Sequence, residues 1–173
     1  LLICSKCHHV QLDTEINPKI LFDNYSYKTG ISVSFKKHFS DFSQKLCKHF
    51  DIQNKNYSDI KILDIGSNDS TLLDILGSAG FQTFGVEPAI NLASDSSHQV
   101  FNGFFNDTNV CKIYREFGSF DVITANNVFA HTRKLNQFVN NMSKILNENG
   151  FISIEVQYLP ELIDNCYIDM IYH

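Results

Sequence analysis

The sequence predicts an α/β fold with a doubly wound, Rossmann-like parallel sheet, and three observations carry this prediction. From residue 60 onward, short runs of Val, Ile, Leu and Phe alternate with helical stretches. These runs are apolar throughout, which is typical of strands that are buried on both faces of a parallel sheet. The chain has 173 residues, 43% of them hydrophobic, which is enough for one sizeable core.

Five strands are expected, separated by helices. The strands are predicted at residues 60–65, 81–87, 98–105, 120–126 and 151–158. The helices are predicted at 71–78, from about 89, from about 110, and at 135–146. Right-handed crossovers make such a sheet doubly wound, and its ligands bind beyond the carboxyl ends of the strands.

A leader precedes the sheet. Apolar residues recur at helical spacing over residues 32–50 and predict an amphipathic helix that packs against the sheet domain; they are Val33, Phe35, Phe39, Phe42, Leu46 and Phe50. The polar stretch 51–59 is the expected boundary, which divides the chain into a leader at 1–58 and a sheet domain at 59–173.

Composition argues against two classes of partner. Only 19% of the residues are charged and the net charge is −5, so no basic field attracts a nucleic acid or an anionic membrane. No apolar run approaches the roughly 18 residues of a membrane span, and the first residues do not resemble a secretory signal. We therefore expect a cytoplasmic protein, while the sequence makes no prediction of oligomeric state.

The stretch "LDIGSNDSTLL" reads as a strand, a tight turn and a helix. A dinucleotide-binding turn carries three glycines in the pattern GxGxxG. This chain has Gly66, Asn68 and Thr71 at those three positions, which weakens the interpretation as a pyrophosphate site. A ligand without phosphates does not need the backbone to approach it so closely. Gly66 alone can make the turn, while Asp64, Ser67 and Asn68 offer polar atoms to an amino acid's ammonium and carboxylate. S-adenosylmethionine has such an end.

Further candidates follow the later strands. Glu87 lies 21 residues after Gly66, where an acid can accept both hydroxyls of a ribose; the alternative is a solvated acid. Phe104 or Phe105 is placed to flank an adenine ring, although each also suits the core. After the fourth strand, Asn126 is expected over the ligand. His131 follows one helical turn beyond it and is expected to face the pocket.

Taken together, these motifs resemble the class I S-adenosylmethionine-dependent methyltransferases, and within them the zinc-binding sugar C-methyltransferases that act on nucleotide-linked 4-keto-deoxysugars. The matching stretches are "CSKCHHVQL", "LFDNYSY", "LDIGSNDSTLL", "GVEPA", "ANNVFAHT", "FISIEVQYL" and "IDMIYH". The family's turn usually carries glycine where this chain has Ser70, and a serine there is expected to cap the following helix.

The resemblance implies two cofactors, S-adenosylmethionine and structural zinc. Family members hold zinc with two CxxC pairs, and Cys4 and Cys7 resemble the second pair, with His8 or His9 as partial substitutes; free thiols are the alternative reading. Both ends of the sequence read as cut. These 173 residues are therefore expected to bind the cofactor without completing methyl transfer.

The resemblance also implies catalytic roles. Similar proteins continue past "IYH" to a second histidine, the proposed base, and to a further domain that completes the sugar site. His131 and Tyr172, with His173 in the same motif and Tyr27 as a further candidate, are implied to polarise or orient a nucleotide-linked keto sugar. Tyr25 and Tyr27 equally suit packing. Competing readings are an O- or N-methyltransferase, an NAD-dependent oxidoreductase and a non-catalytic nucleotide-binding module.

Overall fold

The computed structural model describes residues 1–14, 16–22 and 25–167, and these contain a five-stranded sheet in which every neighbouring pair is parallel. The strand order is β5-β4-β3-β6-β7. The strands are β3 (Lys61–Ile65), β4 (Gln82–Glu87), β5 (Gln99–Asn102), β6 (Phe120–Asn126) and β7 (Leu146–Glu155). This arrangement confirms the expected doubly wound α/β fold.

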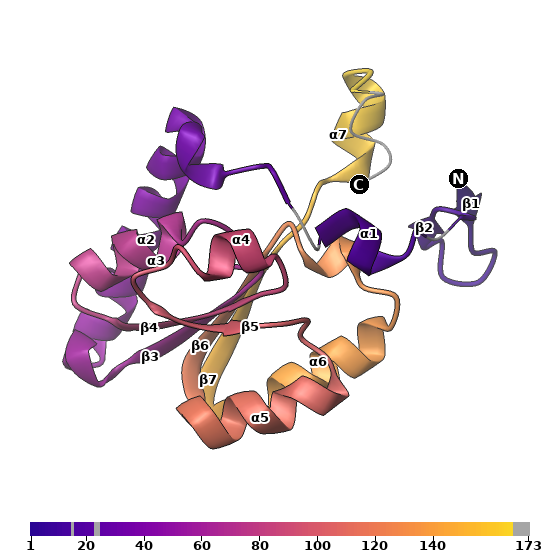
Figure 1. The fold of residues 1–173 in the computed structure, drawn as a ribbon. Helices are drawn as coiled ribbons and strands as arrows, with labels where there is room; N and C mark the ends of the chain where they lie inside the picture. The colour runs from indigo at the N-terminus through magenta and orange to yellow at the C-terminus, as the bar shows by residue number, and fades with distance from the viewer. Residues whose placement is uncertain (15, 23–24, 168–173) are drawn as a thin grey trace.

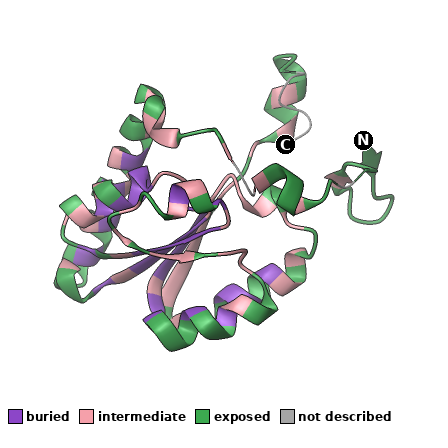
Figure 2. Ribbon diagram, viewed as in Figure 1, coloured by how far each residue is buried: buried purple, intermediate pink, exposed green. Residues whose placement is uncertain are grey.

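Helices cover both faces of the sheet, as Figure 1 shows. Buried side chains of α5 and α6 pack under one face, and those of α2 and α3 pack on the other. Buried residues lie along the central strands β3, β4 and β6 and on the helix faces that meet them, whereas β7 is only partly buried (Figure 2). The helices are α2 (Val33–Ile52), α3 (Thr71–Ser78), α4 (Ile90–Ala93), α5 (Asp107–Phe117) and α6 (Leu135–Ile145).

The leader helix α2 packs on the sheet as expected. Phe39, Leu46 and Phe50 are buried in one cluster with Ile62 of β3. Val33 departs from the predicted stripe because it lies at the start of the helix and is 82% exposed. The helix begins where Ser32 accepts a hydrogen bond from the Phe35 N–H at 3.3 Å, which is the usual role of a serine at an N-cap.

Several element boundaries differ from the sequence prediction. Strand β5 ends at Asn102 instead of residue 105. Helix α5 begins at Asp107 instead of near Val110, because the side chain of Asn106 caps it by accepting the Asn109 N–H at 3.0 Å. Strand β7 covers 146–155 instead of 151–158, since Leu146 already pairs with Phe120 before an irregularity in the register. Neither pairing nor capping leaves a periodic hydrophobic signal.

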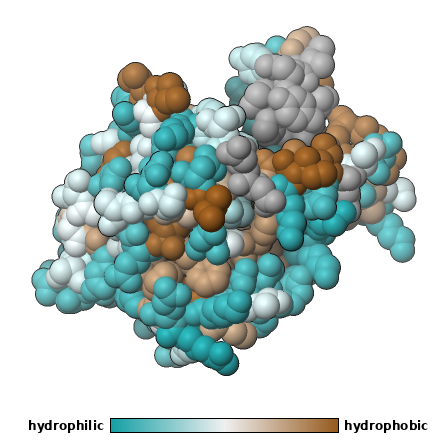
Figure 3. Space-filling view, in the orientation of Figure 1, coloured by the Kyte–Doolittle hydropathy of each residue, from teal (hydrophilic) through white to brown (hydrophobic). Residues whose placement is uncertain are grey.

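Smaller elements surround the sheet. They are β1 (Leu2–Ile3), β2 (Val10–Gln11), α1 (Pro18–Phe22), η1 (Thr29–Ile31), η2 (Tyr57–Asp59), η3 (Phe129–His131) and α7 (Leu159–Asp164). The β1–β2 hairpin lies at the N-terminal end, apart from the sheet (Figure 1). Apolar surface lies over this end of the molecule (Figure 3), and Leu1, Leu2, Ile3 and Ile20 are all at least half exposed. Among the described residues, no helix has both the length and the apolar character to cross a membrane.

Candidate functional site

A cavity of about 580 Å³ opens at the carboxyl ends of the central strands. This volume lies in the range of small-molecule sites. The cavity sits at the point where the strand order reverses between β3 and β6, which is where open α/β sheets bind their ligands. Its lining includes every described residue that the sequence predicted for the cofactor or the substrate: Tyr27, Asp64, Gly66, Ser67, Asn68, Glu87, Phe104, Asn126 and His131.

Gly66 makes the turn after β3. Its φ is +73°, and a Cβ at this position would lie 2.5 Å from Cγ2 of Val128, so both conformation and space require glycine. Its N–H donates to the Val86 carbonyl at 2.7 Å and extends the contact between the two strands. The expectation that this one glycine makes the turn fits the geometry.

Asp64 is the most deeply buried acid at the cavity floor. Its Oδ1 accepts hydrogen bonds from Thr124 Oγ1 at 2.6 Å and from Asn126 Nδ2 at 3.5 Å. Burial raises the pKa of this carboxyl from 3.8 to about 7, and the nearby Glu87 charge adds to the rise, while the Thr124 and Asn126 bonds oppose it. Near neutral pH, Asp64 therefore exchanges between a charged acceptor and a neutral donor.

Glu87 ends β4, and the residue is 5% exposed. Oε2 accepts the Asn68 N–H at 2.9 Å, and Oε1 accepts the Ala89 N–H at 2.8 Å. Burial raises the pKa of Glu87, and these two bonds act in the opposite direction. Two backbone bonds thus fix the carboxylate at the cavity wall, and each oxygen retains a lone pair for a further donor.

Ser67 carries an unpaired hydroxyl at the cavity. The residue is 3% exposed and its Oγ has no hydrogen-bond partner among the described residues. A Cβ on Gly85 would lie 2.6 Å from this oxygen, so the glycine on β4 makes room for the serine. A buried, unpaired hydroxyl is unfavourable unless a ligand or water completes its bonding.

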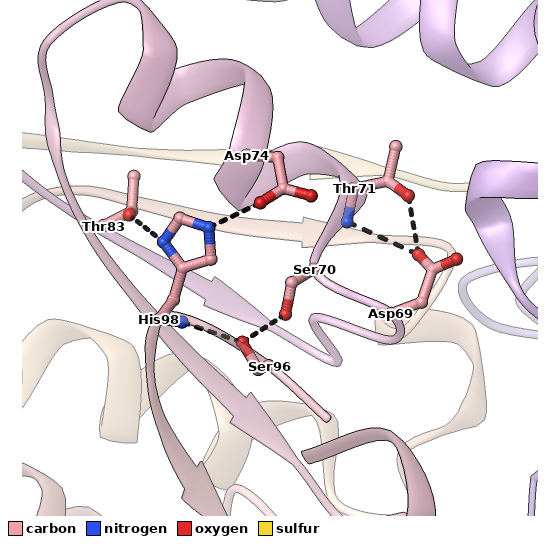
Figure 4. A network of polar contacts seen from close by, with 7 residues as sticks. All are labelled: Asp69, Ser70, Thr71, Asp74, Thr83, Ser96 and His98. Carbon is pink, nitrogen blue, oxygen red and sulfur yellow. Dashed lines mark hydrogen bonds and ion pairs between the residues drawn. The ribbon is translucent and has the colours of Figure 1, made fainter. Parts of the chain in front are cut away.

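The predicted helix cap at Ser70 is wrong. Ser70 occupies the N-cap position of α3 with a φ of +64°, but its side chain makes no capping bond. The hydroxyl instead pairs with Ser96 Oγ at 2.7 Å, and Ser96 Oγ also accepts the His98 N–H at 3.1 Å (Figure 4). The side chain of Asp69 bonds the start of the helix, accepting from Thr71 Oγ1 at 2.7 Å (Figure 4).

His98 completes this network behind the turn. Nε2 contacts Asp74 Oδ1 at 2.8 Å, and Nδ1 contacts Thr83 Oγ1 at 2.8 Å (Figure 4). Asp74 belongs to α3 and Thr83 to β4. The imidazole therefore connects the helix that follows the turn to the neighbouring strand. Ser96 connects the backbone N–H of His98 to the Ser70 hydroxyl.

Asn68 and Asp69 hold the leader over the turn. Asn68 Oδ1 accepts the Thr29 N–H at 3.0 Å and its Nδ2 donates to the Tyr27 carbonyl at 3.0 Å. Asp69 Oδ2 accepts the Gly30 N–H at 2.9 Å. The Asn68 side-chain amide is thus hydrogen-bonded to backbone groups of the leader. Its contact with the amino-acid end of a ligand stays a prediction.

Aromatic rings line the leader side of the cavity. The Phe22 ring centroid lies 5.6 Å from that of Tyr25, 6.4 Å from that of Phe104 and 6.3 Å from that of His131. The Tyr27 ring centroid lies 6.4 Å from that of Tyr25, and Tyr27 is 48% exposed. Burial raises the pKa of the Tyr25 phenol, with smaller contributions from Tyr27 and Glu87. Tyr27 and His131 therefore lie at the cavity where the sequence predicted them.

Two groups of predicted site residues are not at this cavity: one lies on the N-terminal hairpin, and the other lies outside the residues that the structure describes. Cys4 and Cys7 are exposed on the β1–β2 hairpin. The pKa of the Cys4 thiol is lowered because the Cys7 and Lys6 N–H groups, and the Cys7 thiol, bond it. Within residues 1–14, 16–22 and 25–167, no group of three or more His, Cys, Asp or Glu could hold a metal. Tyr172 and His173 lie outside the described residues.

Several cavity residues were missed at the sequence level. Phe22 follows no strand, and only tertiary packing brings it to the site. Asn141 is buried on α6 among the apolar residues Phe138, Met142 and Ile145. A polar residue on an otherwise apolar helical stripe is the signal that could have identified Asn141.

Comparison with known proteins agrees with this geometry. Residues 37–169 match the family model described as "Methyltransferase domain". Because this match covers most of the chain, the chain belongs to the methyltransferase domain family. It is similar to the C-methyltransferase NovU of Streptomyces niveus, with 26% identity over 176 residues, covering 100% of this chain and 41% of NovU.

Two solved structures are similar in fold. The plantazolicin methyltransferase BpumL, in complex with a triazolic desmethylPZN analog and SAH, aligns with a TM-score of 0.58 and 14% identity, over 73% of this chain and 50% of BpumL. The SAM-bound amino pentose methyltransferase CalS10 of Micromonospora echinaspora aligns with a TM-score of 0.57 and 15% identity, over 82% of this chain and 61% of CalS10. The chain thus spans about two fifths of NovU and half of BpumL.

Proposed function

We propose that this chain carries the cofactor half of an S-adenosylmethionine-dependent C-methyltransferase that methylates the carbon next to the ketone of a nucleotide-linked deoxysugar. The observation that carries the proposal is the cavity, which unites the Gly66 turn, the buried Glu87 carboxylate and the unpaired Ser67 hydroxyl. The similarity to NovU supports transfer to carbon.

The polar groups at the cavity fit this cofactor. The Glu87 lone pairs match two ribose hydroxyls, and the Ser67 hydroxyl matches a polar group at the amino-acid end. Phe104 offers a ring face to the adenine. The turn has one glycine where pyrophosphate-binding turns have three, which favours a ligand without phosphates over NAD.

Bound S-adenosylmethionine supplies an activated methyl group, so the protein must hold the nucleophilic carbon of the sugar in line with it. A ketone makes the proton on the neighbouring carbon acidic, and a base must remove that proton while a donor stabilises the enolate oxygen. His131 and Tyr27 lie at the cavity and are proposed to orient the sugar and polarise its ketone. Tyr172 and His173 are proposed to act with them, and the base to be the family's second histidine.

The cofactor proposal is tested by binding. S-adenosylhomocysteine should raise the thermal midpoint of the chain in a concentration-dependent way, whereas NAD at equal concentration should not. The reverse preference would favour an oxidoreductase, and no shift with either ligand would contradict the cofactor assignment.

The substrate proposal is tested with a longer chain that includes the second histidine. Incubation with a nucleotide-linked 4-keto-deoxysugar in D₂O should exchange the proton on the neighbouring carbon, and addition of S-adenosylmethionine should add one methyl group to that carbon. Methylation at oxygen or nitrogen without exchange would contradict transfer to carbon.

Cys4 and Cys7 are proposed as two of the four ligands of a structural zinc ion. The support is their placement on one hairpin, since cysteine thiolates bind zinc. Two ligands do not complete a tetrahedral site. Elemental analysis should therefore find far less than one zinc in the 173-residue chain and close to one in a chain that adds an upstream CxxC pair.

A further inference from the structure

Asn141 is a residue of the cavity wall that carries a buried, unpaired donor. The residue lies on α6, is 0% exposed and belongs to the cavity lining. Its Oδ1 accepts a hydrogen bond from Lys144 Nζ at 2.9 Å. Its Nδ2 has no hydrogen-bond partner among the residues that the structure describes.

The orientation of this amide is fixed by its neighbour. Lys144 is a donor only, so it must face the amide oxygen, and the nitrogen is the atom left without a partner. A buried N–H without a partner is unfavourable by about 1 to 3 kcal/mol. Its neighbours Phe138, Met142 and Ile145 are apolar, and an apolar side chain at position 141 would avoid this cost.

The surroundings define the acceptor that Asn141 would meet. Phe104, Phe105 and Phe138 line the cavity too, and the rings of Phe105 and Phe138 lie 5.2 Å apart. Aromatic walls favour a flat ring over a flexible chain. A neutral N–H in a cavity with such walls suits the in-plane lone pair of a ring nitrogen, which a purine carries.

Nearby polar groups are already paired. The Gln137 Nε2 donates to Asp107 Oδ2, and Lys144 lies 3.8 Å from Asp107 Oδ1. Asp107 therefore compensates the Lys144 charge. Gln137 and Asn141 both line the cavity, but only the Asn141 nitrogen lacks a partner.

We propose that Asn141 Nδ2 donates a hydrogen bond to a ring nitrogen of the cofactor's adenine and so determines base specificity. This inference rests on the proposed function, since it assumes that the adenosyl group occupies the cavity. Asn141 then selects a purine with nitrogen at that position against a ring that carries C–H there.

Calorimetry with S-adenosylhomocysteine and its 1-deaza, 3-deaza and 7-deaza analogues tests the proposal. Each analogue replaces one ring nitrogen by C–H. Wild-type protein should bind one analogue about tenfold more weakly than the parent, because one hydrogen bond is lost and a buried donor stays unpaired. Asn141→Leu should bind the parent about tenfold more weakly and should not distinguish it from that analogue.

Stability separates a binding role from a packing role. Asn141→Leu removes an unpaired donor, so its ligand-free thermal midpoint should equal or exceed that of the wild type while its affinity falls. The matched control is Gln137→Leu, which should leave the ratio of parent to analogue affinity unchanged because its amide nitrogen already has a partner. Asn141→Asp replaces the donor by an acceptor and serves as a second variant if the leucine variant does not fold; it should bind the parent more weakly still.

The outcomes are distinguishable. If wild-type protein binds S-adenosylhomocysteine and all three analogues equally, the inference is overturned while the proposed function stands. The same conclusion follows if Asn141→Leu retains wild-type affinity and discrimination. If wild-type protein does not bind S-adenosylhomocysteine, the proposed function and the inference both fail.

Discussion

Replacing Glu87 by alanine is the most direct test of the cofactor site. Glu87 is 5% exposed, and its two carboxylate oxygens accept hydrogen bonds from the N–H groups of Asn68 and Ala89. Because these bonds fix its position, little freedom is lost when two ribose hydroxyls donate to the remaining lone pairs. Charge-assisted hydrogen bonds of this kind contribute about 1.5 to 3 kcal/mol. Affinity for S-adenosylhomocysteine should therefore fall by a factor of about 10 to 150.

Calorimetry at constant pH measures this loss, and a matched variant controls for structural damage. Asp121 Oδ2 also accepts a backbone N–H, that of Lys61 at 2.9 Å, and its Oδ1 accepts from Asn147 Nδ2 at 2.9 Å. Asp121 lies at the amino end of β6, away from the cavity lining. Asp121→Ala should lower the thermal midpoint without changing the affinity of the folded protein. Equal affinities for wild type and folded Glu87→Ala would remove Glu87 from the site.

Three further predictions concern the turn, the cavity floor and the catalytic helper. Ser70→Gly should be more stable than Ser70→Ala by about 1 to 2 kcal/mol in urea unfolding, because both lose the Ser96 bond but only glycine suits a φ of +64°. The pKa of Asp64 is raised from 3.8 to about 7, so the native state retains a proton that the unfolded state releases between these values. Stability should therefore fall as pH rises through this window, by about 4 kcal/mol in total at about 1.4 kcal/mol per pH unit, and Asp64→Asn should remove this slope. In the longer chain, His131→Ala should lower kcat by about 10² while S-adenosylhomocysteine affinity stays nearly constant, because His131 is proposed to act on the enolate.

Each of these predictions has a result that contradicts it. Equal stabilities of the two Ser70 variants would mean that the turn relaxes out of the left-handed conformation. A wild-type pH profile parallel to that of Asp64→Asn would mean that the native carboxyl is already ionised at low pH. A parallel loss of kcat and cofactor affinity in His131→Ala would assign the histidine to the adenosyl group.

The sheet and the place of the candidate site follow from the sequence alone. Unbroken apolar runs that alternate with amphipathic helical stretches are typical of a parallel sheet buried on both faces, so strands β3, β4 and β6 were predicted close to their observed bounds. Asp64, Gly66 and Glu87 follow from the same pattern, because residues at the carboxyl ends of parallel strands meet at one edge. Local periodicity carries this information.

Contacts between segments far apart in the chain become visible only in the folded structure. The Asn68 amide bonds residues 39 and 41 positions away, and Phe22 reaches Phe104 and His131 across the cavity. No periodic pattern encodes such pairings, since each depends on how the leader folds back over the sheet. The same holds for Ser70, whose partner Ser96 comes from a different loop, and for Asn141, whose unpaired nitrogen is visible only once the core around it is packed.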